Sequence, residues 1–193
     1  MNAQIAYALI THPTAAMRRL RTTGALGSGI TMLVAASVST SVAWAVISAA
    51  AAGAVGPLVL AAFALFTTAS VFALWLFLGG LTHSAACLMG GYGNFGRFLA
   101  AYGLVSAPFT LCAPAIILLS PLGASGTALF FLAVVPLIIV WAWVLAIIGI
   151  KEIYGLSAGT ATVASLLPCL LVAAVGLLLP FTTIISIGLR LGI

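Results

Sequence analysis

Charged side chains are nearly missing from this sequence. They make up 4% of its 193 residues, whereas hydrophobic residues make up 65% and the mean hydropathy is +1.39. A soluble globular domain carries roughly 25% charged residues. This chain has too few charged side chains to form a water-exposed surface, so its composition predicts an integral membrane protein. The net charge of +5 comes from scattered basic residues that form no phosphate-binding stripe. Nucleic acid is therefore not expected as a partner.

Acidic side chains are the scarcest, since Glu152 is the only carboxylate among the side chains. Ion-coupled transporters and pumps usually place Asp, Glu or His within the bundle, whereas Glu152 and His83 lie near the ends of apolar runs. This argues against an ion-coupled transporter and leaves open a passive path for a neutral solute. Because an unpaired charge at a bilayer boundary is costly, we predict that Glu152 contacts Arg97 or an arginine near the N-terminus.

Cysteine is also rare, and Cys87, Cys112 and Cys169 lie far apart in apolar stretches. They form no C-x-x-C motif and no metal-ligand spacing, so we expect buried small hydrophobes. The sequence predicts neither a metal site nor a cofactor.

Long apolar runs, by contrast, are abundant. Five of them reach the length of about 20 residues that crosses a bilayer: 26–51, 58–81, 95–120, 127–150 and 159–187. In lipid only helices and closed barrels satisfy the backbone polar groups, and these runs are too long and too uniformly apolar for barrel strands. The prediction is an all-α, polytopic membrane bundle of five transmembrane helices over residues 26–193. The second helix is expected to continue past Gly79-Gly80 to Cys87.

The basic residues predict the orientation of this bundle. With the N-terminus in the cytoplasm, all but one of them lie inside: Arg18, Arg19, Arg21, Arg97 and Lys151 inside and Arg190 outside. The positive-inside rule thus places the N-terminus in the cytoplasm and the C-terminal tail outside. Residues 1–25, 82–94 and 151–158 are expected to be cytoplasmic.

Residues 1–25 read as a basic leader outside the core. Apolar residues recur there at helical spacing beside the arginines, which favours a short amphipathic segment held on anionic lipid; a frayed leader is the alternative. Arg18-Arg19 before an apolar run also resembles a twin-arginine signal peptide, but the run is long enough to span.

Prolines and small residues mark two further features of the runs. Pro108, Pro114, Pro136, Pro168 and Pro180 predict kinks in the last three helices, either as packing features or as the lining of a cavity. In the first run, small residues recur at every fourth position: Gly27, Thr31, Ala35, Ser39 and Ala43. Such a stripe lets helices approach closely, within the same bundle or between chains.

The segment Gly155-Leu156-Ser157-Ala158-Gly159 matches the G-x-S-x-G pattern of a hydrolase nucleophile elbow. That elbow needs a strand before the serine, whereas a membrane helix precedes Ser157. The expected role is an N-cap, with the hydroxyl accepting from the amide of residue 159 or 160. A second match, G-x-S-G at Gly123 to Gly126, resembles the rhomboid protease motif but lies on the side opposite both histidines. No catalytic residue is predicted.

A family resemblance spans nearly the whole chain. The segments that carry it are Trp141-Ala142-Trp143, the stretch Gly149-Ile150-Lys151-Glu152-Ile153-Tyr154-Gly155-Leu156-Ser157, the glycine-rich stretch Gly90 to Arg97 with Tyr102 and Pro108 following, and His12-Pro13-Thr14-Ala15-Ala16-Met17-Arg18-Arg19. Together they resemble the signatures of the Yip1 domain family. The motif positions are Trp141, Gly149, Lys151, Glu152, Gly155, Leu156, Ser157, Gly91, Arg97, Tyr102 and Pro108.

The resemblance implies a five-helix membrane domain with the N-terminus inside, and the chain looks like a prokaryotic member in the inner (plasma) membrane. The long acidic N-terminal segment of the eukaryotic Golgi members is absent, so their binding of Rab-type GTPases is not carried over. Thr160 stands where many relatives have lysine.

We therefore expect a non-enzymatic membrane protein that acts through helix–helix contacts or local membrane organisation. Its expected partners are membrane lipids and either a second copy or another membrane protein. The alternatives are a passive channel or carrier for a neutral or lipidic substrate, and an intramembrane hydrolase.

Overall fold

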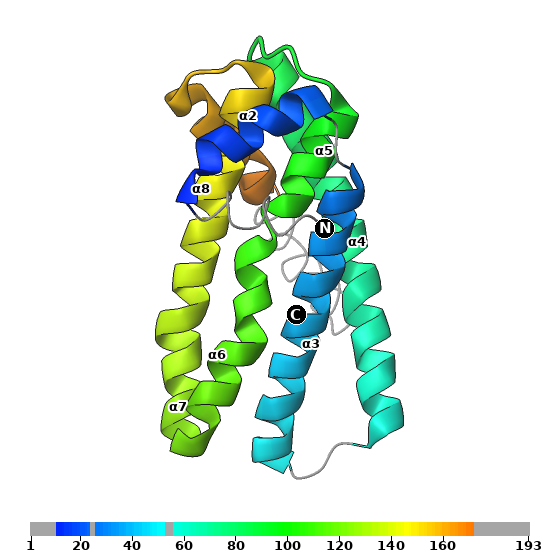
Figure 1. The fold of residues 1–193 in the computed structure, drawn as a ribbon, viewed down its shortest axis with the longest axis vertical. Coiled ribbons are helices and arrows are strands. Elements are labelled where there is room, and N and C mark those ends of the chain that lie inside the picture. The colour runs from blue at the N-terminus through cyan, green and yellow to red at the C-terminus, as the bar shows by residue number, and fades with distance from the viewer. Residues whose placement is uncertain (1–10, 24–25, 53–55, 172–193) are drawn as a thin grey trace, which may run out of the picture.

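The computed structural model describes residues 11–23, 26–52 and 56–171, and all of the secondary structure in these ranges is helical (Figure 1). The elements in chain order are α2 (Pro13–Thr23), α3 (Leu26–Ala52), α4 (Pro57–Leu88), α5 (Phe95–Leu104), the 3-10 helix η1 (Ala107–Leu111), α6 (Cys112–Leu119), the 3-10 helix η2 (Ser120–Leu122), α7 (Ala124–Leu129), the π-helix η3 (Phe130–Val134), α8 (Val135–Tyr154) and a last helix, Ala158–Leu171. The predicted all-α class is confirmed.

Four stretches are long and apolar enough to cross a membrane: Leu26–Ala49, Pro57–Leu88, Phe95–Leu122 and Ala124–Tyr154. They correspond to the first four predicted runs, and α4 continues past Gly79-Gly80 to Leu88 as expected. The fifth run is described only as far as Leu171, and its remainder lies outside the described residues. The count of five spans stays a prediction.

The helical path changes at two of the predicted prolines. Pro108 lies in η1, which interrupts the third span between α5 and α6. Pro136 is the second residue of α8, which begins where the π-helix η3 ends. Because proline has no N–H to donate to the preceding turn, the backbone there changes its hydrogen-bond spacing instead of continuing as a regular α-helix.

The core has a main cluster where α2, α5, α8 and the last helix meet. Met17 and Ala16 of α2 are buried in it together with Phe98, Leu145 and Ile150. Figure 1 shows α2 lying across one end of the bundle, next to α5 and α8. The apolar face of α2 is therefore covered by protein, and the placement of residues 1–25 outside the membrane core stays a prediction.

Helices α3 and α5 are in backbone contact at two glycines, Gly29 and Gly103, that the predicted stripe did not include. A Cβ on Gly103 would lie 2.7 Å from the carbonyl carbon of Gly29. The contact thus depends on the absence of side chains, as in other small-residue helix pairs.

The predicted stripe on α3 divides along its length. Gly27 and Thr31 are exposed, Ala35 is half-buried, and Ser39 and Ala43 are buried within the chain. The Ser39 hydroxyl donates to the Thr110 carbonyl over 2.8 Å and accepts from the amide of Ala113 over 2.9 Å. Ser39 therefore supplies hydrogen-bond partners to two backbone groups at the junction of η1 and α6.

The cysteines depart in part from the expectation of burial. Cys112 is buried in a second apolar cluster with Ile116, Phe130 and Ile138, whereas Cys87 and Cys169 are exposed. Cys169 belongs to a predicted span, where an exposed apolar side chain meets lipid rather than water, so burial inside the protein is not required of it.

Candidate functional site at the basic end

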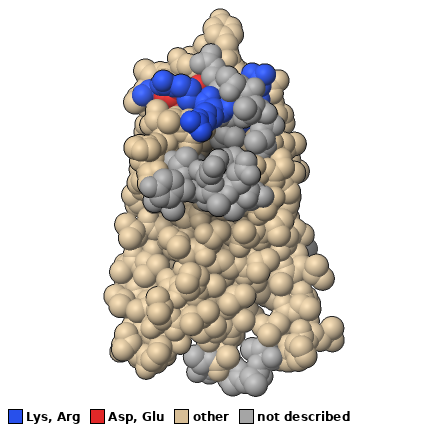
Figure 2. Space-filling view, viewed as in Figure 1, with Lys and Arg blue, Asp and Glu red and all other residues tan. Residues whose placement is uncertain are grey.

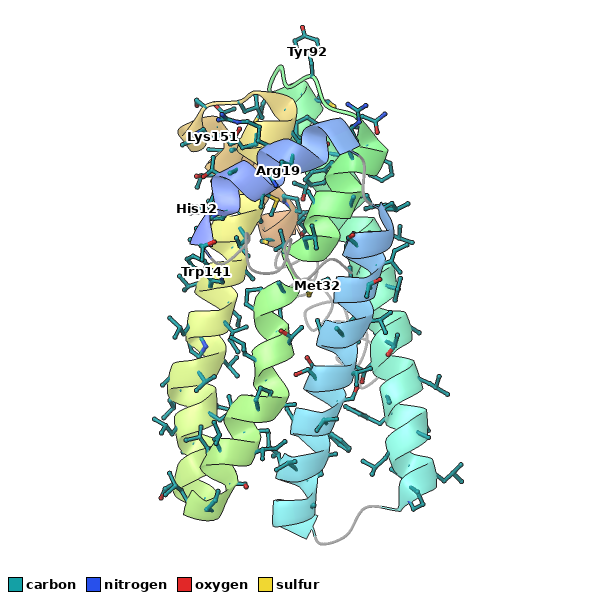
Figure 3. The ribbon with its side chains drawn as sticks, in the orientation of Figure 1. His12, Arg19, Met32, Tyr92, Trp141 and Lys151 are labelled. Atoms are coloured by element: carbon teal, nitrogen blue, oxygen red, sulfur yellow. The ribbon has the colours of Figure 1, made fainter. Side chains whose placement is uncertain are left out.

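Three segments that are far apart in the sequence meet at one end of the bundle, called here the basic end. They are α2, the loop from Gly90 to Asn94, and the end of α8 with the turn Gly155 to Ser157. Figure 2 shows basic side chains gathered at this end, and Figure 3 places Arg19 and Lys151 there below Tyr92. The glycine-rich, leader and G-x-K-E motifs thus form one surface.

Tyr154 is the centre of this arrangement. Its ring lies where a side chain on Gly93 would be, since a Cβ there would come within 2.5 Å of two ring carbons. A Cβ on Gly91 would lie 2.8 Å from both the Tyr154 Cβ and the Ala86 carbonyl oxygen. The amide of Tyr92 donates to the Tyr154 carbonyl over 3.2 Å. The glycines of the loop are therefore required by close packing against Tyr154.

The hydroxyl of Tyr154 is hydrogen-bonded to Nδ1 of His83 from α4. The Cys87 sulfur lies 3.8 Å from Nε2 of the same imidazole. Phe98 packs against the Tyr154 ring with a centroid distance of 5.3 Å. These contacts tie α4, α5 and α8 together beneath the loop.

Local sequence explains how the turns form. Gly155 ends α8 in the left-handed conformation with φ 69°, which glycine adopts without strain. Asn94 caps α5 by accepting from the amide of Arg97 over 3.1 Å. Ser157 accepts from the amide of Thr160 over 3.2 Å at the start of the last helix, which is the predicted N-cap.

Glu152 is paired across the chain with α2. Nε of Arg18 donates to its carboxylate over 3.0 Å; the carboxylate is nearly buried, whereas the Arg18 side chain is largely exposed. Of the two predicted partners, the N-terminal arginine is confirmed, and Arg97 is not the partner in this ion pair. The reason is that α2 packs directly over the end of α8.

This geometry does not assemble a hydrolase. Ser157 bonds to Thr160, His83 to Tyr154 and Glu152 to Arg18, so each candidate member of a triad has a different partner. A catalytic triad instead needs the base bonded to both the nucleophile and the acid. Within residues 11–23, 26–52 and 56–171, no group of three or more His, Cys, Asp or Glu side chains gathers to hold a metal ion.

The remaining motif positions lie in and below this region. Gly149 is buried on α8, where a Cβ would meet the Met17 sulfur at 3.7 Å, and Leu156 packs against the main cluster. Pro108 is buried, Tyr102 is half-buried, and Trp141 faces outward from α8 (Figure 3). Lys151 and Arg97 are exposed.

Tyr92 differs from its neighbours because its side chain is 91% exposed. It projects from the tip of the loop, beyond every helix of the basic end (Figure 3). Its backbone is nevertheless held by the bond to Tyr154 and by the packed glycines on either side. The loop therefore presents an aromatic ring on a rigid support.

Sequence reasoning missed three of these features. Met17, Tyr154 and the protruding Tyr92 all lie in the family motifs, but the sequence analysis predicts no role for any of them. The sequence holds a partial signal, since the glycines on both sides of Tyr92 are typical of a turn.

Comparison with known families identifies one match. The Yip1 domain model matches residues 7–179, which include all three segments of the basic end. No curated protein and no solved structure matches the chain.

Proposed function

The chain belongs to the Yip1 domain family, and on this premise we propose that it is a non-enzymatic membrane protein that holds a partner protein at its basic end. The observation that carries the proposal is Tyr92, an almost fully exposed aromatic ring on a loop whose backbone is packed against Tyr154. Buried aromatic anchors supply most of the energy of protein interfaces, and a rigid support lowers the entropy lost on binding.

Charge indicates what kind of partner fits. Arg18, Arg19, Arg97 and Lys151 are exposed around the loop, and the one carboxylate, Glu152, is nearly buried against Arg18. A second copy of the same surface would bring like charges together. The proposed partner is therefore an acidic cytoplasmic segment of another membrane protein.

The finer topology belongs to this proposal. Five spans follow from the five apolar runs of the sequence, and the positive-inside rule places the N-terminus and the basic end in the cytoplasm; the proposed location is an inner (plasma) membrane. Single cysteines at Ala3, Gly56, Ser125 and Ser157 of a cysteine-free variant report the sidedness with an impermeant thiol reagent. Labelling from outside at position 3 or 157 contradicts the orientation.

The stripe on α3 remains a candidate for a second contact within the membrane. Only Gly27 and Thr31, its exposed part, are free for another chain, because Ser39 and Ala43 pack within this one. Thr31→Leu is expected to weaken association of copies in membranes without affecting insertion.

The experiment that tests the docking surface places a photoreactive phenylalanine analogue at position 92. The matched control is position 58, because Leu58 is 82% exposed and lies at the opposite end of the bundle. We expect a protein adduct from position 92 alone, reduced by the charge reversal Arg97→Glu. Replacing Tyr92 by alanine should weaken the association by about 2 kcal/mol, or roughly thirtyfold.

Two results would contradict the proposal. Equal adduct yields from positions 92 and 58 would indicate contact by chance. A yield from position 92 that Arg97→Glu leaves unchanged would show that the partner is not acidic.

A second candidate function is a passive carrier for a neutral or lipidic substrate. A groove of about 350 Å³ between α3, α4 and α5 favours it. Movement of such a solute across liposomes by the purified protein would support this alternative.

A further inference from the structure

Near the basic end, α4 carries a histidine and a cysteine on one face. His83 and Cys87 are four residues apart, the spacing at which side chains of an α-helix stand next to each other. The helical H-E-x-x-H motif uses the same spacing to present two ligands to one metal ion. In the structure the Cys87 sulfur lies 3.8 Å from Nε2 of His83. Thiolate and imidazole together are a ligand set for soft and borderline transition metals.

The Cys87 thiol is accessible to a metal ion. It takes part in no disulfide and its side chain is exposed. The sulfur lies beside the imidazole, since it is also 3.9 Å from Nδ1. A metal ion bound to Nε2 therefore requires a turn of the thiol about the Cα–Cβ bond of Cys87, which an exposed side chain can make. Binding replaces the thiol proton, which is released to solvent.

The imidazole of His83 is held from two sides. Its Nδ1 is hydrogen-bonded to the Tyr154 hydroxyl, and its centroid lies 5.0 Å from that of the Phe95 ring. A histidine that binds a metal through one ring nitrogen almost always donates its other N–H to a neighbouring acceptor. When the ring proton is on Nδ1 and is donated to the Tyr154 oxygen, Nε2 keeps a lone pair for a metal ion.

The number of ligands and the local charge indicate which metal fits. Within residues 11–23, 26–52 and 56–171, no third His, Cys, Asp or Glu side chain joins the pair, whereas protein zinc sites use three or four such ligands. Monovalent copper favours thiolate and is commonly two-coordinate. One Cu(I) bound to one thiolate and one neutral imidazole carries no net charge, which suits the end of a membrane helix.

We propose that Cys87 and His83 form a binding site for monovalent copper, with Sγ and Nε2 as the ligands and Tyr154 as the residue that positions the imidazole. The site is independent of the proposed partner protein, because neither ligand belongs to the exposed surface around Tyr92. Cysteine spacing in the sequence does not indicate this site, because one of its two ligands is a histidine.

Competition with a chromophoric Cu(I) chelator tests the site. The purified protein is reduced, kept free of oxygen and titrated with the Cu(I) complex of bathocuproine disulfonate. The substitutions Cys112→Ala and Cys169→Ser leave Cys87 as the only cysteine. We expect this Cys87-only variant to withdraw one Cu(I) per chain from the chelator. If it withdraws none, the proposal is wrong.

The matched control keeps Cys169 as the only cysteine, through Cys87→Ser and Cys112→Ala. Cys169 is also exposed on a helix, but position 165, four residues before it, is serine instead of histidine. We expect this variant to leave the copper with the chelator. Equal uptake by the two variants would show that an exposed thiol is sufficient and would overturn the pair.

Two substitutions in the Cys87-only variant test the imidazole and its support. Tyr154→Phe removes the oxygen that orients the ring, and loss of such an outer partner typically weakens metal binding by about 10–100-fold. His83→Gln keeps a group that can bond to the Tyr154 hydroxyl but removes the ligand, so it should weaken binding more than Tyr154→Phe. Unchanged affinity in His83→Gln would overturn the site, and unchanged affinity in Tyr154→Phe would overturn the positioning role.

X-ray absorption at the copper edge provides a readout other than affinity. We expect one sulfur and one nitrogen neighbour, with the nitrogen lost in His83→Gln, and an elution volume that copper does not change. Two sulfur neighbours together with the elution volume of a dimer would show that the thiols of two copies hold the ion, against the proposal. Displacement of the copper by excess Zn²⁺ would overturn the assignment to a monovalent ion.

Discussion

Replacing Gly103 by alanine tests how far the bundle depends on the close approach of α3 and α5. The added Cβ would lie 2.7 Å from the carbonyl carbon of Gly29, whereas ordinary contacts of this kind start at 3.4 Å, so α3 must recede by 0.7 Å. The obstacle is backbone and cannot rotate away. Overpacking of this kind costs about 1–3 kcal/mol.

The same substitution at Gly80 provides the control. Gly80 lies inside α4, and a Cβ there would meet nothing within 4 Å. Both variants gain the helix propensity of alanine over glycine, about 1 kcal/mol, so their difference isolates the overpacking cost. For a chain of this size that difference is a gap of roughly 3–10 °C in melting temperature.

The assay is thermal unfolding of the purified variants in one detergent, followed by loss of the monodisperse peak in size-exclusion chromatography. Gly80→Ala should match or exceed the wild type, and Gly103→Ala should fall below it. If Gly103→Ala were as stable as Gly80→Ala, the two helices would not be in backbone contact at this point.

Three further predictions concern the polar contacts. Ser39→Ala should lower stability by about 1–3 kcal/mol in the same assay, because two backbone groups lose their partner; an unchanged melting temperature would contradict the bridge. Arg18→Ala should destabilise more than Glu152→Gln, because only the former leaves a nearly buried carboxylate without its guanidinium; the reverse order would be inconsistent with the pairing. Ser157→Ala should lower the stability of the fold by about 1 kcal/mol through loss of the cap. A fluorophosphonate probe should not label Ser157, and stoichiometric labelling would instead support the hydrolase hypothesis.

Much of the fold could be predicted because its signals are local. The length and uniformity of the apolar runs determine that helices form, and proline determines where the regular hydrogen bonding changes, as at Pro108 and Pro136. The Ser157 cap also depends on residues within one turn. Each of these needs only a short window of sequence.

The features that sequence reasoning missed depend on distant partners. Nothing near Met17 indicates that it packs over Gly149, and nothing near Gly29 indicates that Gly103 faces it. For Glu152 the need for a cation was predictable from its charge. The choice of Arg18 over Arg97 required knowing where α2 lies.

The position of α2 also constrains the order in which the protein assembles. Its contacts lie on α8 and α5, and Arg18 and Glu152 are 134 residues apart in the chain. Segments fold as they leave the ribosome from the N-terminus onward, so α2 is made first and its binding surface much later. The Met17 side chain of α2 therefore stays exposed until the spans up to α8 have been inserted. Docking of α2 can occur only in a chain whose first four spans are in place.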